Sequence, residues 1–83
     1  MIRERTIVDE AKLRFSHMEP IEAVLRFAAL TYHSLDASGS AEKIAGAQRM
    51  GRGQAVRGLI LLKLSREEAE KRAKWIEDGE IGS

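Results

Sequence analysis

The stretch AEKIAGAQRMGRGQAVRGLILLKL, residues 41–64, decides the fold of this 83-residue chain. As one helix, it would align a stripe of mostly small residues on one face: Ile44, Ala47, Gly51, Ala55, Gly58 and Leu62. A glycine inside a helix costs about 0.8–1 kcal/mol relative to alanine, so the stripe needs a packing reason. The close approach of a second helix backbone would supply that reason. The first interpretation is therefore one long helix with a close-packing face.

Two other interpretations of this segment stay open. The helix would break at Gly51–Gly53 if the glycines adopt turn conformations, which leaves helices 41–50 and 54–64 joined by a tight turn. Residues 58–64, GLILLKL, are also compatible with a strand, because a short apolar run fits a buried strand as well as a helix. The pattern favours a helix, continuous or broken, over a strand.

Each alternative brings a resemblance to a DNA-binding fold. The apolar run followed by SREE makes residues 59–83 similar to the strand and first helix of ribbon-helix-helix repressors, with Leu59 and Leu61 at outward positions. That resemblance covers half of the fold and implies strand pairing in a dimer. In the broken helix, the order of Ile44, Gly51 and Val56 resembles a helix-turn-helix. Both resemblances imply binding in the major groove.

Apolar spacing predicts two helices before this segment. One group of apolar side chains falls at helical spacing and predicts a helix over residues 4–17: Ile7, Val8, Ala11, Phe15 and Met18. Pro20 disfavours helical angles at Glu19 and suits the first turn of a helix, so a second helix is expected over residues 20–35. Apolar side chains cover much of the circumference of this second helix, which makes it the expected central element.

Capping residues mark the remaining boundaries. Ser40 ends a loop over residues 36–40 and is a suitable N-cap for a helix from Ala41. Ser65 and Glu68 form a capping-box pattern that opens a last helix running to about Asp78. Gly79 is placed to end that helix, and residues 79–83 are expected to fray. We therefore predict one all-α domain, residues 1–83, built as a small bundle of four or five short helices.

Composition restricts the class of protein. The chain has no cysteine, and its longest wholly apolar run, Leu59–Leu62, is far shorter than the roughly 18 residues that a membrane span needs. Arg3 and Arg5 are not followed by an apolar segment, so no secretory signal is expected. These features predict a cytoplasmic protein that does not enter a membrane.

Positive charge gathers in the middle of the chain although the net charge is only +1. Residues 37–66 carry six Lys or Arg and one Glu, and an acidic segment follows. Within the basic segment 43–66, four residues are candidates for binding a ligand or phosphate: Arg49, Arg52, Arg57 and Lys43. The segment lacks the Lys-Ser/Thr pair of a nucleotide-triphosphate loop. The alternative is that the arginines are solvated or pair with Glu67, Glu70 and Asp78 of the last helix.

Catalysis and metal binding have little support in the sequence. His17 and His33 are the only histidines, and neither has a second histidine or glutamate at metal-binding spacing on its helix. The glutamates of the first turn of the last helix complement the helix dipole. We expect a protein without metal or cofactor that is not an enzyme.

The apolar and small residues predict association. An interface is expected at Gly51, Ala55, Gly58, Leu61 and Trp75, with self-association as a homodimer or higher oligomer. The predicted function is an oligomeric protein-interaction module such as an adaptor, an inhibitor or an assembly subunit. The alternative is a regulator that binds DNA, a nucleotide or another phosphate-bearing ligand through the basic segment.

Overall fold

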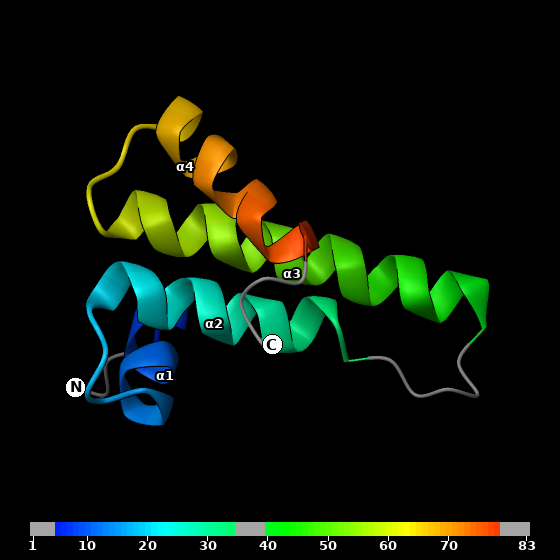
Figure 1. Ribbon diagram of the computed structural model, residues 1–83, viewed down its shortest axis with the longest axis horizontal. Helices are drawn as coiled ribbons and strands as arrows, with labels where there is room; N and C mark the ends of the chain where they lie inside the picture. Colours follow the sequence, from blue (N-terminus) through cyan, green and yellow to red (C-terminus); the bar gives the residue numbers. More distant parts are fainter. Residues whose placement is uncertain (1–4, 35–39, 79–83) are drawn as a thin grey trace.

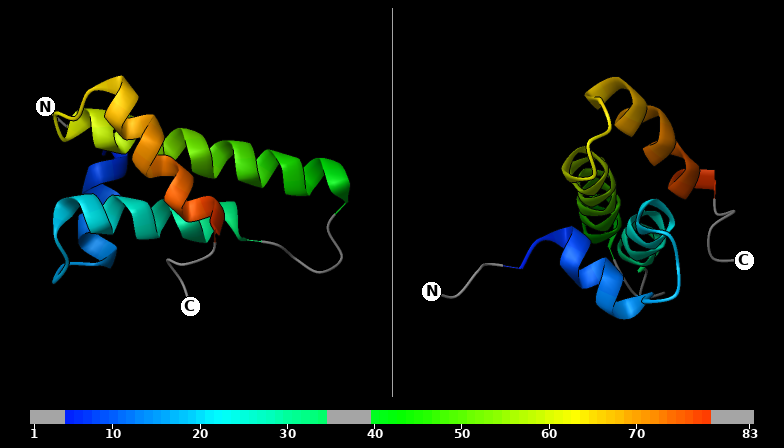
Figure 2. Two further views of the ribbon diagram at one scale, coloured as in Figure 1. Left: turned by 45° about the horizontal axis from the view of Figure 1, so that its top comes forward. Right: turned by 90° about the vertical axis from the view of Figure 1, so that its left-hand side faces the viewer.

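The computed structural model describes residues 5–34 and 40–78, in which helices are joined by short turns. The elements are α1 (Ile7–Arg14), α2 (Pro20–Tyr32), α3 (Ala41–Leu61), α4 (Arg66–Ala73) and the 3-10 helix η1 (Lys74–Asp78). Figure 1 shows α2 and α3 side by side and antiparallel, and Figure 2 shows α1 and α4 on different sides of that pair. The described part of the chain contains no strand, so the predicted all-α bundle is confirmed.

Helix α3 is continuous, so the two other interpretations of residues 41–64 were wrong. Gly51–Gly53 lie inside the helix rather than in a turn, and residues 58–61 are helical rather than extended. The strand of a ribbon-helix-helix protein and the central turn of a helix-turn-helix are therefore both absent from this segment. The physical reason for continuity is packing, because α3 lies against α2 along much of its length (Figure 1).

Glycines bring α2 and α3 unusually close together. A Cβ atom at Gly51 would lie 2.7 Å from the backbone nitrogen of Tyr32, and one at Gly58 would lie 2.5 Å from Val24 Cγ1. Real Cβ atoms essentially never approach other heavy atoms so closely, so a side chain at either position would force its neighbours to shift. Ala55, between them on the same face, is fully buried. The predicted close-packing face is therefore real, and its partner is α2 of the same chain.

Helix ends follow the predicted caps with some differences. The Ser40 hydroxyl accepts a hydrogen bond from the amide of Lys43, and the Ser65 hydroxyl accepts one from the amide of Glu68. Thr6 forms a full capping box with Asp9, which was not among the predicted caps. Its hydroxyl accepts from the Asp9 amide at 3.2 Å, and its own amide donates to the Asp9 carboxylate at 3.1 Å. The first helix therefore begins at Ile7 and not at residue 4.

The end of α3 is closed by a residue in the left-handed conformation. Lys63 has a φ of 77°, its amide donates to the Ile60 carbonyl, and the amide of Leu64 donates to the Leu59 carbonyl. This arrangement is a Schellman motif, in which glycine usually takes the left-handed position. The turn redirects the chain so that α4 packs back across α3 (Figure 1).

The last predicted helix is divided into α4 and η1. Ala69, Ala73 and Ile76 lie buried on one face as expected, and Trp75 is 41% exposed at the edge. Besides the buried Ile76, a hydrogen bond and an ion pair join η1 to the bundle. A ring nitrogen of His33, Nε2, lies 2.7 Å from the Ile76 carbonyl oxygen, and Arg52 pairs with Glu77. The predicted cap Gly79 and the tail 79–83 lie outside the described residues.

The core lies between the helices and contains only apolar residues among those the structure describes. Its largest fully buried side chains are Leu25, Leu59, Ile76 and Val24. In the described part of the chain, no helix is long and apolar enough to cross a membrane.

Candidate functional site on the outward face of α3

Helix α3 also has a second glycine pair, which faces away from the core. A Cβ atom at Gly46 or at Gly53 would meet no heavy atom within 4 Å. These glycines are seven residues apart, so they lie on one line along the helix, and Ile60 continues that line. We call this surface the arginine face and define it by Gly46, Arg49, Met50, Gly53, Val56, Arg57 and Ile60.

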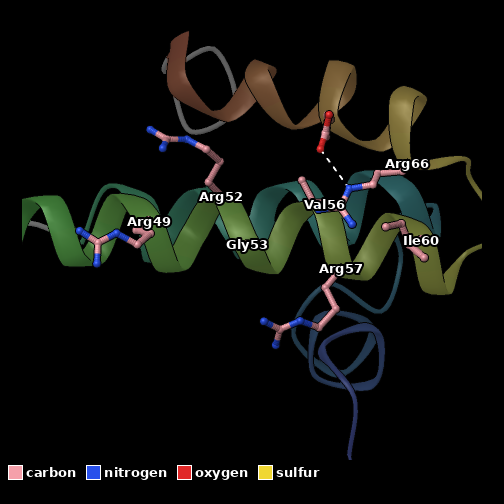
Figure 3. Close-up of a pocket in the computed structure, with 8 residues that line it drawn as sticks. Arg49, Arg52, Gly53, Val56, Arg57, Ile60 and Arg66 are labelled. Atoms are coloured by element: carbon pink, nitrogen blue, oxygen red, sulfur yellow. Dashed lines mark hydrogen bonds and ion pairs between the residues drawn. The ribbon is translucent and has the colours of Figure 1, made fainter.

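Two shallow hollows meet on the arginine face. The first is a groove of about 430 Å³ between α3 and α4, and its lining includes Val56, Ile60 and four arginines, Arg49, Arg52, Arg57 and Arg66 (Figure 3). The second is lined by α3 alone, namely Gly46, Arg49, Met50, Gly53, Gln54 and Arg57. Because both hollows share Arg49, Gly53 and Arg57, they form one continuous surface whose lining is mainly basic and apolar. Glu70, which pairs with Arg66, adds a carboxylate to the first hollow.

Two of the arginines already have carboxylate partners. Arg52 Nε lies 2.6 Å from a carboxylate oxygen of Glu77, and Arg66 Nε lies 3.2 Å from a carboxylate oxygen of Glu70. The hydrogen bond to Glu77, and next the one to Tyr32, raise the pKa of Arg52 above its usual value. Arg52 also lies over the Tyr32 ring, 5.8 Å from its centroid. These contacts tie Arg52 to the bundle.

Arg49 and Arg57 are different, because both are exposed and neither forms an ion pair with the residues at 5–34 and 40–78. They stand four residues before and four after Gly53. At 3.6 residues per turn this spacing places them on opposite sides of the glycine line. In Figure 3, Arg52 points toward α4 while Arg57 points away from it. The face therefore presents two cations around a hollow, both without an ion-pair partner in the described part of the chain.

The structure brings together three of the four predicted ligand-binding residues. Arg49, Arg52 and Arg57 share the groove, whereas Lys43, in the first turn of α3, lines neither hollow. Arg66 joins the groove from α4 and was not among the predicted site residues. No pattern in the sequence places Arg66 there, because its position beside Ile60 depends on the turn after α3.

The predicted interface residues divide into two groups. Gly51, Ala55 and Gly58 are buried, and the glycines pack against α2, so these three residues do not present a surface to another molecule. The prediction that they form an interface between chains is therefore wrong, because they pack between two helices of one chain. Leu61 and Trp75 are 47% and 41% exposed, so they remain accessible.

The histidines do not add a reactive group to this face. His33 contacts the Ile76 carbonyl, and its ring lies edge-on to Tyr32 with centroids 4.8 Å apart. Within the described ranges, no three His, Asp or Glu side chains gather as a possible metal site. Chemically, the arginine face offers guanidinium groups for carboxylates or phosphates and apolar side chains for burial.

Comparisons with protein-family models, curated proteins and solved structures find no match to this chain.

Proposed function

We propose that this protein is a non-enzymatic protein-interaction module whose arginine face binds an acidic region of a partner protein. The observation that carries the proposal is the placement of Arg49 and Arg57, two cations without carboxylate partners among the described residues, around the Gly53 hollow. Met50 and Ile60 on the same face are 61% and 40% exposed. Cations beside exposed apolar side chains suit a partner that presents both carboxylates and apolar groups.

Charge argues against a second copy of this chain as the occupant. A twofold dimer joined at the arginine face would place Arg49 and Arg57 near the same residues of the other copy, because such interfaces are self-complementary. Like charges brought together at an interface are unfavourable. The module therefore acts through a different chain, with opposite charge.

A phosphate-bearing partner fits the face less well. Arg52 and Arg66 are engaged with Glu77 and Glu70, which leaves Arg49 and Arg57, without ion pairs among residues 5–34 and 40–78, for phosphate contacts on this face. Each neutralised phosphate adds about 0.9 to the salt dependence of duplex binding, and stable complexes make several such contacts. Two contacts give weak binding, and the exposed Met50 and Ile60 have no role in it. An acidic protein surface that also carries apolar groups would contact both the arginines and the exposed apolar side chains of this face.

The test compares three probes by fluorescence anisotropy: a 22-residue peptide of Glu, Leu and Ala, its counterpart with Gln for Glu, and a DNA duplex of about 20 base pairs. We expect the Glu peptide to bind more tightly than the other two probes. The double variant Arg49→Gln/Arg57→Gln should bind it about tenfold more weakly, because two ion pairs of up to about 1 kcal/mol each are lost.

The control variant is Lys12→Gln/Lys71→Gln, which removes the same charge from exposed positions on α1 and α4. It should bind the Glu peptide within about twofold of the original chain, since a general charge effect acts equally on both variants. Tighter binding of DNA than of the Glu peptide, or equal losses in both double variants, would contradict the proposal.

A further inference from the structure

We infer that the segment bound by the arginine face is a helix of the partner, lying along α3 over Gly46 and Gly53. Its carboxylates pair with Arg49 and Arg57 on the two sides of the glycine line. This inference rests on the proposed function and adds the conformation and register of the bound segment.

The first argument is the contrast between the two glycine pairs of α3. Gly51 and Gly58 are required by the contact with α2, where a Cβ atom would lie within 2.7 Å of its neighbours. Gly46 and Gly53 have open space around them, yet each costs about 0.8–1 kcal/mol relative to alanine in a helix. Nothing in the described bundle packs against their missing side chains. What they provide is a helix backbone with open space beside it, which another backbone can approach closely.

The second argument is the shape of the face. Gly46, Gly53 and Ile60 follow one another at intervals of seven residues, or about 10.5 Å along the helix. A seven-residue repeat keeps contact with a neighbouring helix that crosses at a small angle. Arg49 and Arg57, eight residues and about 12 Å apart, flank this line on opposite sides. A partner helix with small side chains in its middle and carboxylates at both edges matches this pattern.

A polar group at the edge of the face supports the same conclusion independently. Gln54 lines the hollow that Gly46, Gly53 and Arg57 share, and its Oε1 atom is buried without a hydrogen-bond partner in the described structure. Buried acceptors are nearly always paired in proteins, and an unpaired one is unfavourable. A helix seated in the hollow would offer this amide a donor, and the Gln54 side chain would have to turn its oxygen toward the hollow to accept it.

The backbone explains why the bound segment is a helix and not an extended peptide. Added strands bind to an exposed sheet edge, and the residues described here form no sheet. The backbone groups of α3 are already bonded within the helix, so they give an extended peptide few partners. A helix bonds its own backbone and buries only side chains.

The experiment uses two constrained versions of the Glu, Leu and Ala peptide. One is a 22-residue peptide held helical by a hydrocarbon staple, with alanine every seventh residue and glutamate beside it. The other has the same sequence except that two central residues are replaced by proline, which prevents a helix. Binding is measured by calorimetry to the full chain, to Gly46→Leu/Gly53→Leu, and to the matched control Ala45→Leu. Ala45 is exposed on α3 and lines neither hollow.

We expect the helical peptide to bind the original chain at least tenfold more tightly than the proline peptide. Gly46→Leu/Gly53→Leu should lose at least tenfold in affinity for the helical peptide, while Ala45→Leu stays within about twofold. Because leucine favours helix over glycine and its Cβ atom would meet no heavy atom within 4 Å at either position, the double variant should be at least as stable as the original chain in urea. A loss of binding then reports a blocked surface and not unfolding.

The other outcomes separate the inference from the proposed function. If the two peptides bind equally and both require Arg49 and Arg57, the bound segment need not be a helix. That result would contradict the inference and agree with the proposed acidic partner. Binding of the helical peptide that survives Gly46→Leu/Gly53→Leu would overturn the placement over the glycines. If neither peptide binds, both the inference and the proposed function fail.

Discussion

Gly51 lies directly against the backbone of Tyr32. A Cβ atom at Gly51 would be 2.7 Å from both the Cβ and the amide nitrogen of Tyr32, and 2.8 Å from the carbonyl oxygen of Ala28. Two of these three neighbours are backbone atoms, which cannot rotate away as the end of a side chain can. This contact therefore sets the distance between the last turn of α2 and the middle of α3.

The first prediction concerns this contact. Gly51→Ala should lower the free energy of unfolding by about 1–3 kcal/mol, because the added methyl group overpacks a site that only a shift of the backbone can relieve. Urea denaturation followed by circular dichroism measures the change. Gly58→Ala should also destabilise the protein, since its Cβ would meet the buried Val24 side chain at 2.5 Å. An unfolding midpoint of Gly51→Ala equal to that of the original chain would refute the close approach.

The second prediction concerns the outward glycines. Gly46→Ala and Gly53→Ala should each raise the free energy of unfolding by about 0.5–1 kcal/mol, because alanine favours the helix and finds open space at both positions. The two gains should add, since the sites are about 10.5 Å apart along α3 and share no contact. The same urea experiment measures them. A loss of stability in either variant would show that the outward glycines have an internal packing role.

The third prediction concerns the turn after α3. Lys63 has a φ of 77°, a conformation that costs a residue with a side chain about 1 kcal/mol or more. Lys63→Gly should therefore raise the melting temperature. The free energy of unfolding should rise by about 0.5–1 kcal/mol, because the greater entropy of glycine in the unfolded chain offsets part of the relieved strain. Lys63→Ala is the control, because it removes the charge and keeps the strain. If alanine stabilises the protein as much as glycine does, the effect comes from charge and not from the backbone.

The fourth prediction concerns the ion pair between Arg52 and Glu77. The side chains are 50% and 33% exposed, so a double-mutant cycle of Arg52→Ala and Glu77→Ala should give a coupling energy below about 1 kcal/mol that falls as salt rises. The raised pKa of Arg52 gives stability that is present below its unfolded value and lost only as the pH rises through its folded value. That range lies in strong alkali.

Arg52 therefore keeps its charge from about pH 6 to about pH 9, and its titration should not change the coupling energy in this range. Thermal unfolding across this range measures it, with Arg66→Ala/Glu70→Ala as a comparison pair that does not hold η1 to the bundle. A coupling that disappears between those pH values would show that a group other than Arg52 controls the contact.

Local patterns in the sequence predicted much of the fold. Apolar spacing identified α1 and α2, Pro20 marked the start of α2, and Ser40 and Ser65 marked the starts of α3 and α4. These features depend on neighbours within four residues, so the chain encodes them directly. Three of the predicted basic residues also meet in one groove, because they lie on one helix.

Other features depended on contacts between distant segments. The sequence left open whether residues 41–64 form one helix, because glycine permits both a helix and a turn. Packing of α3 against α2 decides this in favour of one helix. Arg66 could not be assigned to the groove from the sequence, since its place beside Ile60 depends on the direction in which the chain leaves the left-handed Lys63.

The glycines of α3 separate the two kinds of information most clearly. The sequence by itself determined that α3 carries glycine pairs at seven-residue spacing, Gly46 with Gly53 and Gly51 with Gly58, and that each glycine costs stability unless something packs against it. The alanines and apolar residues in line with Gly51 and Gly58 marked that pair as the close-packing one, but they did not determine whether its partner is a helix of this chain or of another. Only the position of α2 decided this. Burial against a second helix depends on where that helix lies in space, which the periodicity of one helix does not specify.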